Sequence, residues 1–398
     1  KNLKIGLFGF GCVGKGLYDV LHQTPGLQAE IVKICCKDRT KERPIDLKHF
    51  TFDRDEILNN PEINVVVELI DDAEAAKEIV VSALQKKKAV VTANKKMVAN
   101  NLKELLILQN KYKTPILYES AVCASIPIIR NLEEYYNNDL LKSIKGIVNG
   151  TTNYILTKMF QENISFDDAL KSAQESGYAE SNPSLDIDGF DSKYKLDIIL
   201  AHAYGLLIEP TRITNIGIGR INSFDANYAK EKRSKIKLIA HSYKLENNDI
   251  ISFVMPQFVK NDNELHSVDG VFNGIITESC FADKNVFIGK GAGAFPTASA
   301  VLSDISALTY SYKYEYKKIS QNLSSNHTDN FNMEIYLRSV KLVENDFEPF
   351  QSISEKFQSK EASYIVGTIN FNDLKRTGWL ENPEYSIILK DLVGKMDN

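Results

Sequence analysis

The chain has 398 residues, of which 43% are hydrophobic and 25% are charged, and its formal net charge is −4. This length predicts two or three domains with a sizeable core, and the slightly acidic charge excludes the basic surface that binds nucleic acids or anionic membranes. No apolar run approaches the ~18 residues of a membrane-spanning helix. The expected partner is therefore a small molecule.

The cysteines and histidines give no sign of a disulfide framework or a metal site. The six histidines have no metal-binding spacing, and no C-x-x-C pair occurs among the five cysteines, which are Cys12, Cys35, Cys36, Cys123 and Cys280. The N-terminus enters a predicted strand at once, without the layout of a signal peptide. We therefore expect reduced thiols in a cytoplasmic protein.

Residues 1–124 alternate short apolar strands with amphipathic helices. This alternation predicts an α/β domain with a Rossmann-type open parallel sheet. The expected strands lie at residues 3–8, 31–35, 65–70, 89–92 and 115–118.

The pattern then changes to longer helices and to strands that follow one another directly. This change predicts an α+β catalytic and dimerisation domain over residues 125–319, with an antiparallel sheet. Its small-residue helix near 296–308 is expected to pack back on the first domain. Residues 331–398 are predicted to form a small separate α+β module, with helices over 350–357 and 373–379.

Three glycines, Gly9, Gly11 and Gly14, follow the first strand and open the first helix. This is the place and spacing of a dinucleotide-binding fingerprint. Gly9 makes the tight turn, Gly11 lets a pyrophosphate approach the backbone, and Gly14 lets helix and strand pack closely. A simple βα turn is the alternative.

The loop after the second strand carries the residues that distinguish NAD from NADP. Asp38 suits the ribose 2′-hydroxyl of NAD, whereas Lys37, Arg39 and Lys41 suit the 2′-phosphate of NADP. The three basic side chains favour NADP slightly, and a charged surface loop without either role is the alternative.

The strand at residues 89–92 ends in Thr92-Ala93-Asn94-Lys95. In open α/β sheets ligands bind at the carboxyl ends of the strands. Lys95 is therefore expected to reach a substrate carbonyl, whereas the neighbouring Lys96 is expected to face solvent.

Two further loops lead into predicted helices. In residues 149–153 (NGTTN), Thr151 or Thr152 is a candidate helix N-cap. The N–H and hydroxyl groups of this loop suit a substrate carboxylate equally well. Residues 289–293 (GKGAG) are rich in glycine, which suits either close approach to a ligand or tight packing of the helix that follows.

The segment 177–195 gathers several charged residues around Gly189. Asp191 and Lys195 are four residues apart and share one face if this part of the chain is helical. Such a pair can bind the charged ends of an amino acid and move a proton. The alternative is a solvated ion pair on a helix surface.

Taken together and in this order, these segments resemble the homoserine dehydrogenase family. The matching segments are GFGCVG, VTANK, ESAVCASIP, NGTTNYI, GYAE…DIDGFDSKYK and GKGAGAFPTASAVLSD, and they span roughly residues 5–305. The resemblance implies NAD(P)-dependent interconversion of L-homoserine and L-aspartate 4-semialdehyde, in threonine, methionine and isoleucine biosynthesis. It also implies a homodimer or a dimer of dimers.

The resemblance further assigns roles to residues of this chain. Lys195 corresponds to the general acid/base, and Lys95 and Asp191 accompany it as catalytic residues. The implied substrate-binding residues are Glu180, Asp186, Thr151, Tyr178 and Gly150. The implied cofactor-binding residues are Gly9, Phe10, Gly11, Cys12, Val13, Gly14, Lys37, Arg39, Thr92, Ala93, Lys95 and Gly293. Backbone carbonyls of Glu119, Val122, Ala124 and Ile126 correspond to a structural sodium site.

Three segments depart from the family pattern. Asp71-Asp72 stands where Gly-Gly is frequent, and its two carboxylates would disfavour the extra phosphate of NADP. Cys123 and Ser125 stand where glycine is common in the cation loop. The C-terminal module resembles an ACT regulatory domain in its β-α-β-β-α-β-like order but lacks the usual turn glycine, so it is either threonine-responsive or a dimer-supporting extension.

Two other functions stay open on the residues alone. One is a related Rossmann oxidoreductase that acts on another amino-acid aldehyde or imine. The other is a sensor that binds the cofactor without catalysis, although such a protein has no need of the proton-transfer groups.

Overall fold

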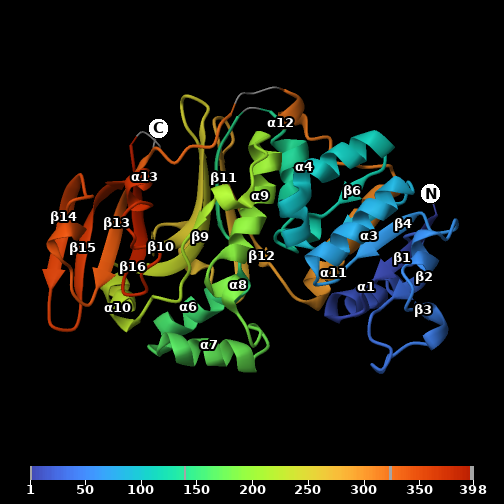
Figure 1. Ribbon diagram of the computed structural model, residues 1–398, viewed down its shortest axis with the longest axis horizontal. Helices are drawn as coiled ribbons and strands as arrows, with labels where there is room; N and C mark the ends of the chain where they lie inside the picture. The colour runs from blue at the N-terminus through green and yellow to red at the C-terminus, as the bar shows by residue number, and fades with distance from the viewer. Residues whose placement is uncertain (1, 139, 322–324, 395–398) are drawn as a thin grey trace. The chain divides into compact units, whose positions relative to one another are not determined.

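The computed structural model describes residues 2–138, 140–321 and 325–394 (Figure 1). These residues form two compact units, and each unit is described by itself. Unit 1 comprises residues 2–138, 197–210 and 289–321, and unit 2 comprises residues 140–196, 211–288 and 325–394. Residues 1, 139 and 395–398 of the three expected domains lie outside the described residues.

Unit 1 is built on a six-stranded sheet in which all pairings are parallel. The strands are β1 (Leu3–Phe8), β2 (Ala29–Cys35), β3 (Phe50–Thr51), β4 (Val65–Glu68), β5 (Ala89–Thr92) and β6 (Ile116–Leu117). The central strands are runs of Val, Ile and Leu because both faces of a parallel sheet are buried. The predicted Rossmann-type sheet is confirmed.

Unit 1 also contains helical segments, some of which connect its strands. They are α1 (Cys12–His22), η1 (Leu47–His49), α2 (Asp55–Leu58), α3 (Ala73–Gln85), α4 (Lys95–Tyr112), η2 (Glu119–Ala121), α5 (Ile128–Arg130), η3 (Asn131–Tyr135), α11 (Ala294–Leu308) and α12 (Lys317–Ser320). Helix α11 packs on α1, where an added Cβ at Gly16 would lie 3.0 Å from the carbonyl oxygen of Ala294. Such a short separation requires glycine on α1.

The strand order of unit 1 is β3-β2-β1-β4-β5-β6. The chain runs outward from β1 to β3 and then returns to the other side of β1. Ligands of such sheets bind outside the carboxyl ends of the strands at this change of direction. The fold therefore predicts a ligand site beside the loops that follow β1, β2 and β4.

Unit 2 is built on a large sheet, with order β12-β11-β7-β9-β10-β16-β13-β15-β14, on which β8 pairs with β10. The strands are β7 (Leu141–Ile147), β8 (Thr214–Asn215), β9 (Ser234–Lys244), β10 (Ile250–Lys260), β11 (Phe272–Ser279), β12 (Asp283–Lys290), β13 (Asn332–Ser339), β14 (Ser352–Gln358), β15 (Ser363–Asn370) and β16 (Ser386–Val393). Strands β11, β7, β9 and β10 pair in antiparallel fashion, as predicted.

The other helices belong mainly to unit 2. They are α6 (Gly150–Glu162), α7 (Phe166–Glu175), α8 (Ser184–Ile187), α9 (Phe190–Tyr204), η4 (Pro210–Arg212), α10 (Ser223–Glu231), η5 (Glu264–Ser267), η6 (Glu344–Asp346) and α13 (Phe371–Leu374). The residues of α9 are divided between the two units. In the part of the chain that the structure describes, no helix is long and apolar enough to cross a membrane.

The C-terminal region differs from the sequence-based expectation. The helix predicted over 350–357 is wrong, because these residues form most of β14, an edge strand that pairs with β15. The spacing of Phe350, Ile353 and Phe357 imitates a helical face, but pairing with a neighbouring strand decides the conformation. An added Cβ at Gly367 would lie 2.4 Å from the carbonyl oxygen of Ser352, so this glycine permits the close approach.

The elements of this region follow the order β13-η6-β14-β15-α13-β16, which keeps the predicted β-α-β-β-α-β-like order with two very short helices, and the resemblance to an ACT domain stays a prediction. Strands β13, β14 and β15 follow one another with only η6 between the first two, and α13 ends at Leu374 instead of continuing to residue 379. Strand β16 pairs with β10, so the C-terminal strands extend the sheet of unit 2. The region expected to be a separate module is part of this unit.

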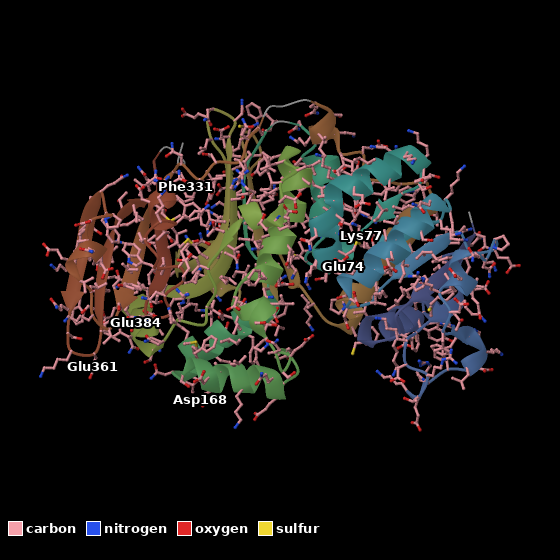
Figure 2. All side chains as sticks on the ribbon, in the orientation of Figure 1. Glu74, Lys77, Asp168, Phe331, Glu361 and Glu384 are labelled. Atoms are coloured by element: carbon pink, nitrogen blue, oxygen red, sulfur yellow. The ribbon has the colours of Figure 1, made fainter. Side chains whose placement is uncertain are left out.

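One hydrophobic core joins these strands to the rest of unit 2. It brings Phe253 of β10 against Phe331, labelled in Figure 2, with ring centroids 5.5 Å apart. The same core contains Met333 of β13, Ile369 of β15 and Trp379. Burial of these side chains explains why the C-terminal strands do not form a core of their own.

Asp225 on α10 connects this helix with strands β13 and β16 through polar contacts. Its carboxylate accepts hydrogen bonds from Arg338 Nε at 2.6 Å, from Tyr336 at 3.1 Å and from Ser386 at 3.2 Å. It also closes the capping box of α10 with Asn222. The Asp225 carboxylate is fully buried, so its charge depends on these partners.

We expect Asp225→Ala to lower the free energy of unfolding by about 3–5 kcal/mol, because it leaves the Arg338 guanidinium buried without its counterion. Chemical denaturation measures this change. The matched control is Asp373→Ala, which removes an exposed carboxylate 3.8 Å from Arg376 and should cost less than about 1 kcal/mol. Equal effects of the two substitutions would contradict the prediction.

Candidate active site

The glycine loop after β1 has the geometry that a dinucleotide requires. Gly9 has φ +93°, and an added Cβ there would lie 2.7 Å from the carbonyl oxygen of Leu69. An added Cβ at Gly14 would lie 2.3 Å from the carbonyl oxygen of Gly9, so helix and loop touch. A Cβ at Gly11 would meet nothing within 4 Å. The open space beside Gly11 is where a phosphate can approach.

Helix α1 begins directly at this opening. Gly11 is its N-cap and provides no side-chain cap, and Phe10, Cys12 and Val13 complete the loop and first turn. The first N–H groups of a helix have no partner within the helix and carry a partial positive charge. This end of α1 therefore suits an anionic group.

The basic loop after β2 is ordered by its own contacts. The carboxylate of Asp38 accepts hydrogen bonds from the N–H and hydroxyl of Thr40 at 2.8 and 2.7 Å, and these bonds lower the pKa of Asp38. The guanidinium of Arg39 lies 5.0 Å from the ring centroid of Phe52. The Asp38 carboxylate is thus engaged locally, while several positive charges remain in the same loop.

Asp72 has a structural role that was not predicted from the sequence. Its carboxylate accepts hydrogen bonds from Glu74 N at 3.1 Å and Ala75 N at 3.0 Å, so it caps α3. It also lies 3.7 Å from Lys37 Nζ, and these partners lower the pKa of Asp72. The charge of Asp72 is therefore partly compensated.

The ends of β4 and β5 are joined by a buried carboxyl group. Glu68 accepts hydrogen bonds from the Thr92 hydroxyl at 2.5 Å and from Ile70 N at 2.6 Å. Burial raises the pKa of Glu68 to about 7. Ala93 and Asn94 follow, and Asn94 caps α4, whose first residue is the partly buried Lys95. Lys96 is exposed, as expected.

The second glycine-rich loop meets the cation loop within unit 1. The carbonyl of Lys290 accepts hydrogen bonds from Ser125 N at 3.2 Å and Ser125 Oγ at 2.9 Å. An added Cβ at Gly289 would lie 2.6 Å from Ser125 Oγ. Gly293 has φ +119° and precedes α11, whose first residue Ala294 contacts Gly16 of α1. The loop is therefore linked to the fingerprint helix.

The four residues of the predicted sodium site lie in one buried loop. The Glu119 carboxylate accepts hydrogen bonds from the N–H groups of Ile129 and Arg130, each at 2.9 Å, and burial raises its pKa to about 8. The carbonyl of Ile126 accepts a hydrogen bond from Ile128 N at 2.8 Å. Val122 is also buried, and Ala124 has φ +40°. The sodium site stays a prediction.

In unit 2, the segment after Gly189 forms the helix expected of it. Gly189 has φ +83°, and α9 begins at the next residue. Lys195 Nζ lies 2.8 Å from Asp191 Oδ2 and donates a hydrogen bond to the carbonyl of Val148 at 2.7 Å. Only 6% of Lys195 and 5% of Asp191 are exposed. The pair is therefore buried, unlike the solvated alternative.

Asn149 joins this pair to a second carboxylate. Its Nδ2 donates to Asp191 Oδ2 at 2.8 Å and to Asp186 Oδ1 at 2.7 Å. Its Oδ1 accepts from Thr152 N at 2.8 Å, so the same amide caps α6. Asn149 was not predicted to be a site residue. An asparagine between a strand and a helix was a signal for the cap, but the two carboxylates come from distant positions.

The other predicted substrate residues lie along the same part of unit 2. Gly150 starts α6, and an added Cβ there would lie 2.8 Å from the carbonyl oxygen of Val271. Thr151 Oγ donates a hydrogen bond to the carbonyl of Tyr178 at 2.6 Å. Tyr178 is 45% exposed and Glu180 is also exposed. The structure therefore links Thr151 to Tyr178.

The geometry of this region combines a buried ammonium, two carboxylates and a helix N-terminus. An ammonium can protonate an oxygen on which negative charge develops. A helix N-terminus can bind a carboxylate, and the carboxylates can bind an ammonium. Together with a nucleotide loop in unit 1, these groups suit a redox enzyme for a zwitterionic substrate.

Family models match most of the chain. One, described as "Homoserine dehydrogenase, NAD binding domain", matches residues 9–119. Another, described as "Homoserine dehydrogenase", matches residues 127–306. The protein named homoserine dehydrogenase from Helicobacter pylori is 40% identical over 315 residues, which are 77% of this chain and 73% of that protein.

Solved structures give the same result. A homoserine dehydrogenase from Thiobacillus denitrificans matches with a TM-score of 0.86 and 28% identity, over 99% of each chain. A hyperthermophilic archaeal homoserine dehydrogenase mutant in complex with NADPH matches with a TM-score of 0.67 and 29% identity. That match covers 79% of this chain and all of the other.

We expect Gly11→Ala to weaken NADPH binding at least about tenfold, because the new methyl group occupies the space open to the phosphates. The free energy of unfolding should change by less than about 1 kcal/mol, since the methyl group meets no protein atom. Fluorescence titration with NADPH and chemical denaturation measure the two quantities. Gly26→Ala is the matched control, because a Cβ at Gly26 also meets nothing within 4 Å. Unchanged NADPH affinity in Gly11→Ala would place the cofactor elsewhere.

Proposed function

We propose that this chain, which belongs to the homoserine dehydrogenase family, uses Lys195 as the general acid/base of its reaction. The enzyme is an NAD(P)-dependent oxidoreductase that interconverts L-aspartate 4-semialdehyde and L-homoserine. The observation that carries the proposed role is the burial of the Lys195 ammonium between Asp191 and the Val148 carbonyl.

The contacts of Lys195 leave its ammonium suited to proton transfer. An ammonium has three N–H donors, and two of them are directed to Asp191 and to Val148. The third can meet the substrate oxygen. When bound, the cofactor supplies or accepts the hydride. Lys195 then donates a proton to the developing alkoxide in one direction and accepts it in the other.

Asp191 and Asn149 hold this group in place. The Asp191 carboxylate compensates the lysine charge and fixes the position of Nζ, while Asn149 fixes the carboxylate. We propose that Lys95 of unit 1 provides a second positive charge for the substrate oxygen. Asp191 therefore acts mainly by orienting Lys195.

The two ends of homoserine require opposite charges. We propose that the substrate carboxylate binds the N-terminal turn of α6, at the N–H groups of Gly150 and Thr151. The substrate ammonium is assigned to Asp186 and Glu180, with Tyr178 beside them. Support comes from the hydrogen bond between Asn149 and Asp186, which turns this carboxylate toward the start of α6.

We propose NADP as the preferred cofactor, held by the fingerprint glycines and by the ends of β2 and β5. Lys37 and Arg39 would bind the 2′-phosphate. Thr92, Ala93, Lys95 and Gly293 would line the rest of the site. Support comes from the local engagement of Asp38 and from the capping role of Asp72. The structural sodium ion, the homodimer or dimer of dimers and the cytoplasmic location stay predictions.

We expect Lys195→Ala to lower kcat about 10²–10⁴-fold, the usual contribution of general acid/base catalysis. NADPH oxidation with L-aspartate 4-semialdehyde measures the rate. Lys193→Ala is the matched control, because Lys193 is a buried lysine of the same helix whose ammonium lies 4.6 Å from the ring centroid of Phe190. A folded Lys195→Ala enzyme with wild-type turnover would refute the assignment.

We expect kcat/KM with NADPH to exceed that with NADH, and Arg39→Ser to reduce the ratio at least about tenfold through loss of a charged phosphate contact. Parallel assays with the two cofactors measure the ratio. Arg376→Ser, a substitution of an exposed arginine in unit 2, should leave it unchanged. A preference for NADH in the wild-type enzyme would instead assign the loop to the ribose 2′-hydroxyl.

A further inference from the structure

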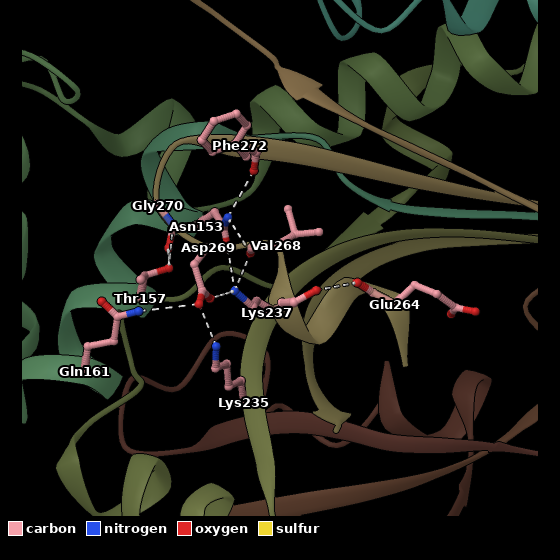
Figure 3. Close-up of polar contacts among 11 residues, drawn as sticks. Asn153, Thr157, Gln161, Lys235, Lys237, Glu264, Val268, Asp269, Gly270 and Phe272 are labelled. Carbon is pink, nitrogen blue, oxygen red and sulfur yellow. Dashed lines mark hydrogen bonds and ion pairs between the residues drawn. The ribbon is translucent and has the colours of Figure 1, made fainter. Parts of the chain in front are cut away.

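A second buried lysine lies in unit 2 outside the proposed catalytic group. Lys237 belongs to β9, and only 1% of it is exposed. Figure 3 shows its polar contacts. Its Nζ donates hydrogen bonds to Val268 O at 2.6 Å, Asp269 Oδ1 at 2.8 Å and Asn153 Oδ1 at 3.0 Å. All three donors of the ammonium are therefore used by the protein.

These contacts bind one loop to one helix. Asn153 lies in the first turns of α6, and its Nδ2 donates to the carbonyls of Val268 and Phe272, both at 3.0 Å. One turn further along α6, Thr157 Oγ accepts a hydrogen bond from Gly270 N at 3.0 Å. Figure 3 shows the hydrogen bonds that connect this loop with the helix and with Lys237.

The same loop touches the first residue of α6. The carbonyl oxygen of Val271 would lie 2.8 Å from a Cβ at Gly150. A side chain at position 150 would clash with this carbonyl group, so glycine allows the loop to lie directly against the first residue of α6. Residues 268–272 therefore pack against the N-terminal turn of α6, which carries the N–H groups of Gly150 and Thr151.

We propose that Lys237 is a positioning residue for substrate recognition: through residues 268–272 and Asn153 it sets the position of the α6 N-terminus that binds the substrate carboxylate. This inference rests on the function proposed above for Gly150 and Thr151. Lys237 itself does not touch the substrate.

Energetics also favour a role in geometry. Removing an ammonium from water costs several kcal/mol, and replacing a buried ion pair by apolar side chains often stabilises a protein. Burial lowers the pKa of Lys237 to about 8, against the opposing effect of Asp269. An ammonium in this place is an inefficient source of stability, but its three donors fix three acceptors in defined directions.

Lys237→Met tests the proposal, with Lys235→Met as its matched control. Lys235 is also on β9 and pairs with the same carboxylate, 2.6 Å from Asp269 Oδ2, but makes no bond to Asn153 or Val268. Each variant is assayed with L-homoserine and with 3-aminopropan-1-ol, which lacks the carboxylate. The preference is measured as the ratio of kcat/KM for the two substrates. Where turnover of 3-aminopropan-1-ol is too slow to measure, its inhibition constant as a competitor of homoserine is measured instead.

We expect Lys237→Met to raise KM for homoserine at least about tenfold and to leave KM for NADP within about twofold. The preference for homoserine over 3-aminopropan-1-ol should shrink by a similar factor, because only the carboxylate contact is disturbed. Hydrogen exchange should quicken at residues 268–272 and in the first turn of α6. Lys235→Met should show none of these changes.

Two outcomes separate this inference from the function on which it rests. If the wild-type enzyme does not discriminate between the two substrates, the carboxylate site at α6 is wrong. If it discriminates and Lys237→Met keeps the full preference, Lys237 has no positioning role. Should Lys237→Met fail to fold, Asn153→Ala keeps the pair between Lys237 and Asp269 and carries the same expectations.

Discussion

The proposed substrate site depends on one side-chain amide, that of Asn149. It caps α6 through its oxygen and holds Asp186 and Asp191 through its nitrogen. Two carboxylates that share one amide lie close enough to repel each other, and the nearby Lys195 ammonium compensates this repulsion. The start of α6, the carboxylates and the lysine are thus one coupled arrangement, in which no group can shift without affecting the others.

Local patterns predicted much of this arrangement. The spacing of Asp191 and Lys195 placed them on one helical face, and Gly189 marked the start of that helix. The fingerprint glycines were predicted for the same reason, because a turn and the helix after it are encoded within a few residues. These predictions needed no knowledge of which strands pair.

The errors and omissions arise where distant parts of the chain decide the outcome. The residues of β14 have a helix-like apolar spacing, but the backbone of β15 pairs with them. Asp186, one of the two carboxylates that Asn149 binds, is 37 residues away from it in sequence. Lys237 and Asn153, which share a hydrogen bond, are 84 residues apart. A single sequence provides no distance between such positions. Similarly, Asp72 was taken as a charge near the cofactor because its capping role depends on the exact start of α3.

Among the described residues of unit 2, three buried lysines show how the surroundings give one residue type different tasks. Lys195 directs two donors to Asp191 and to the Val148 carbonyl, and the third is the donor proposed to meet the substrate oxygen. Lys193 lies over an aromatic ring, and burial lowers its pKa. Lys237 directs all three donors to protein acceptors. Proton transfer requires a donor left over for the substrate, whereas positioning requires that none be left over. The count of bonds made by each ammonium therefore distinguishes the two roles more directly than its burial.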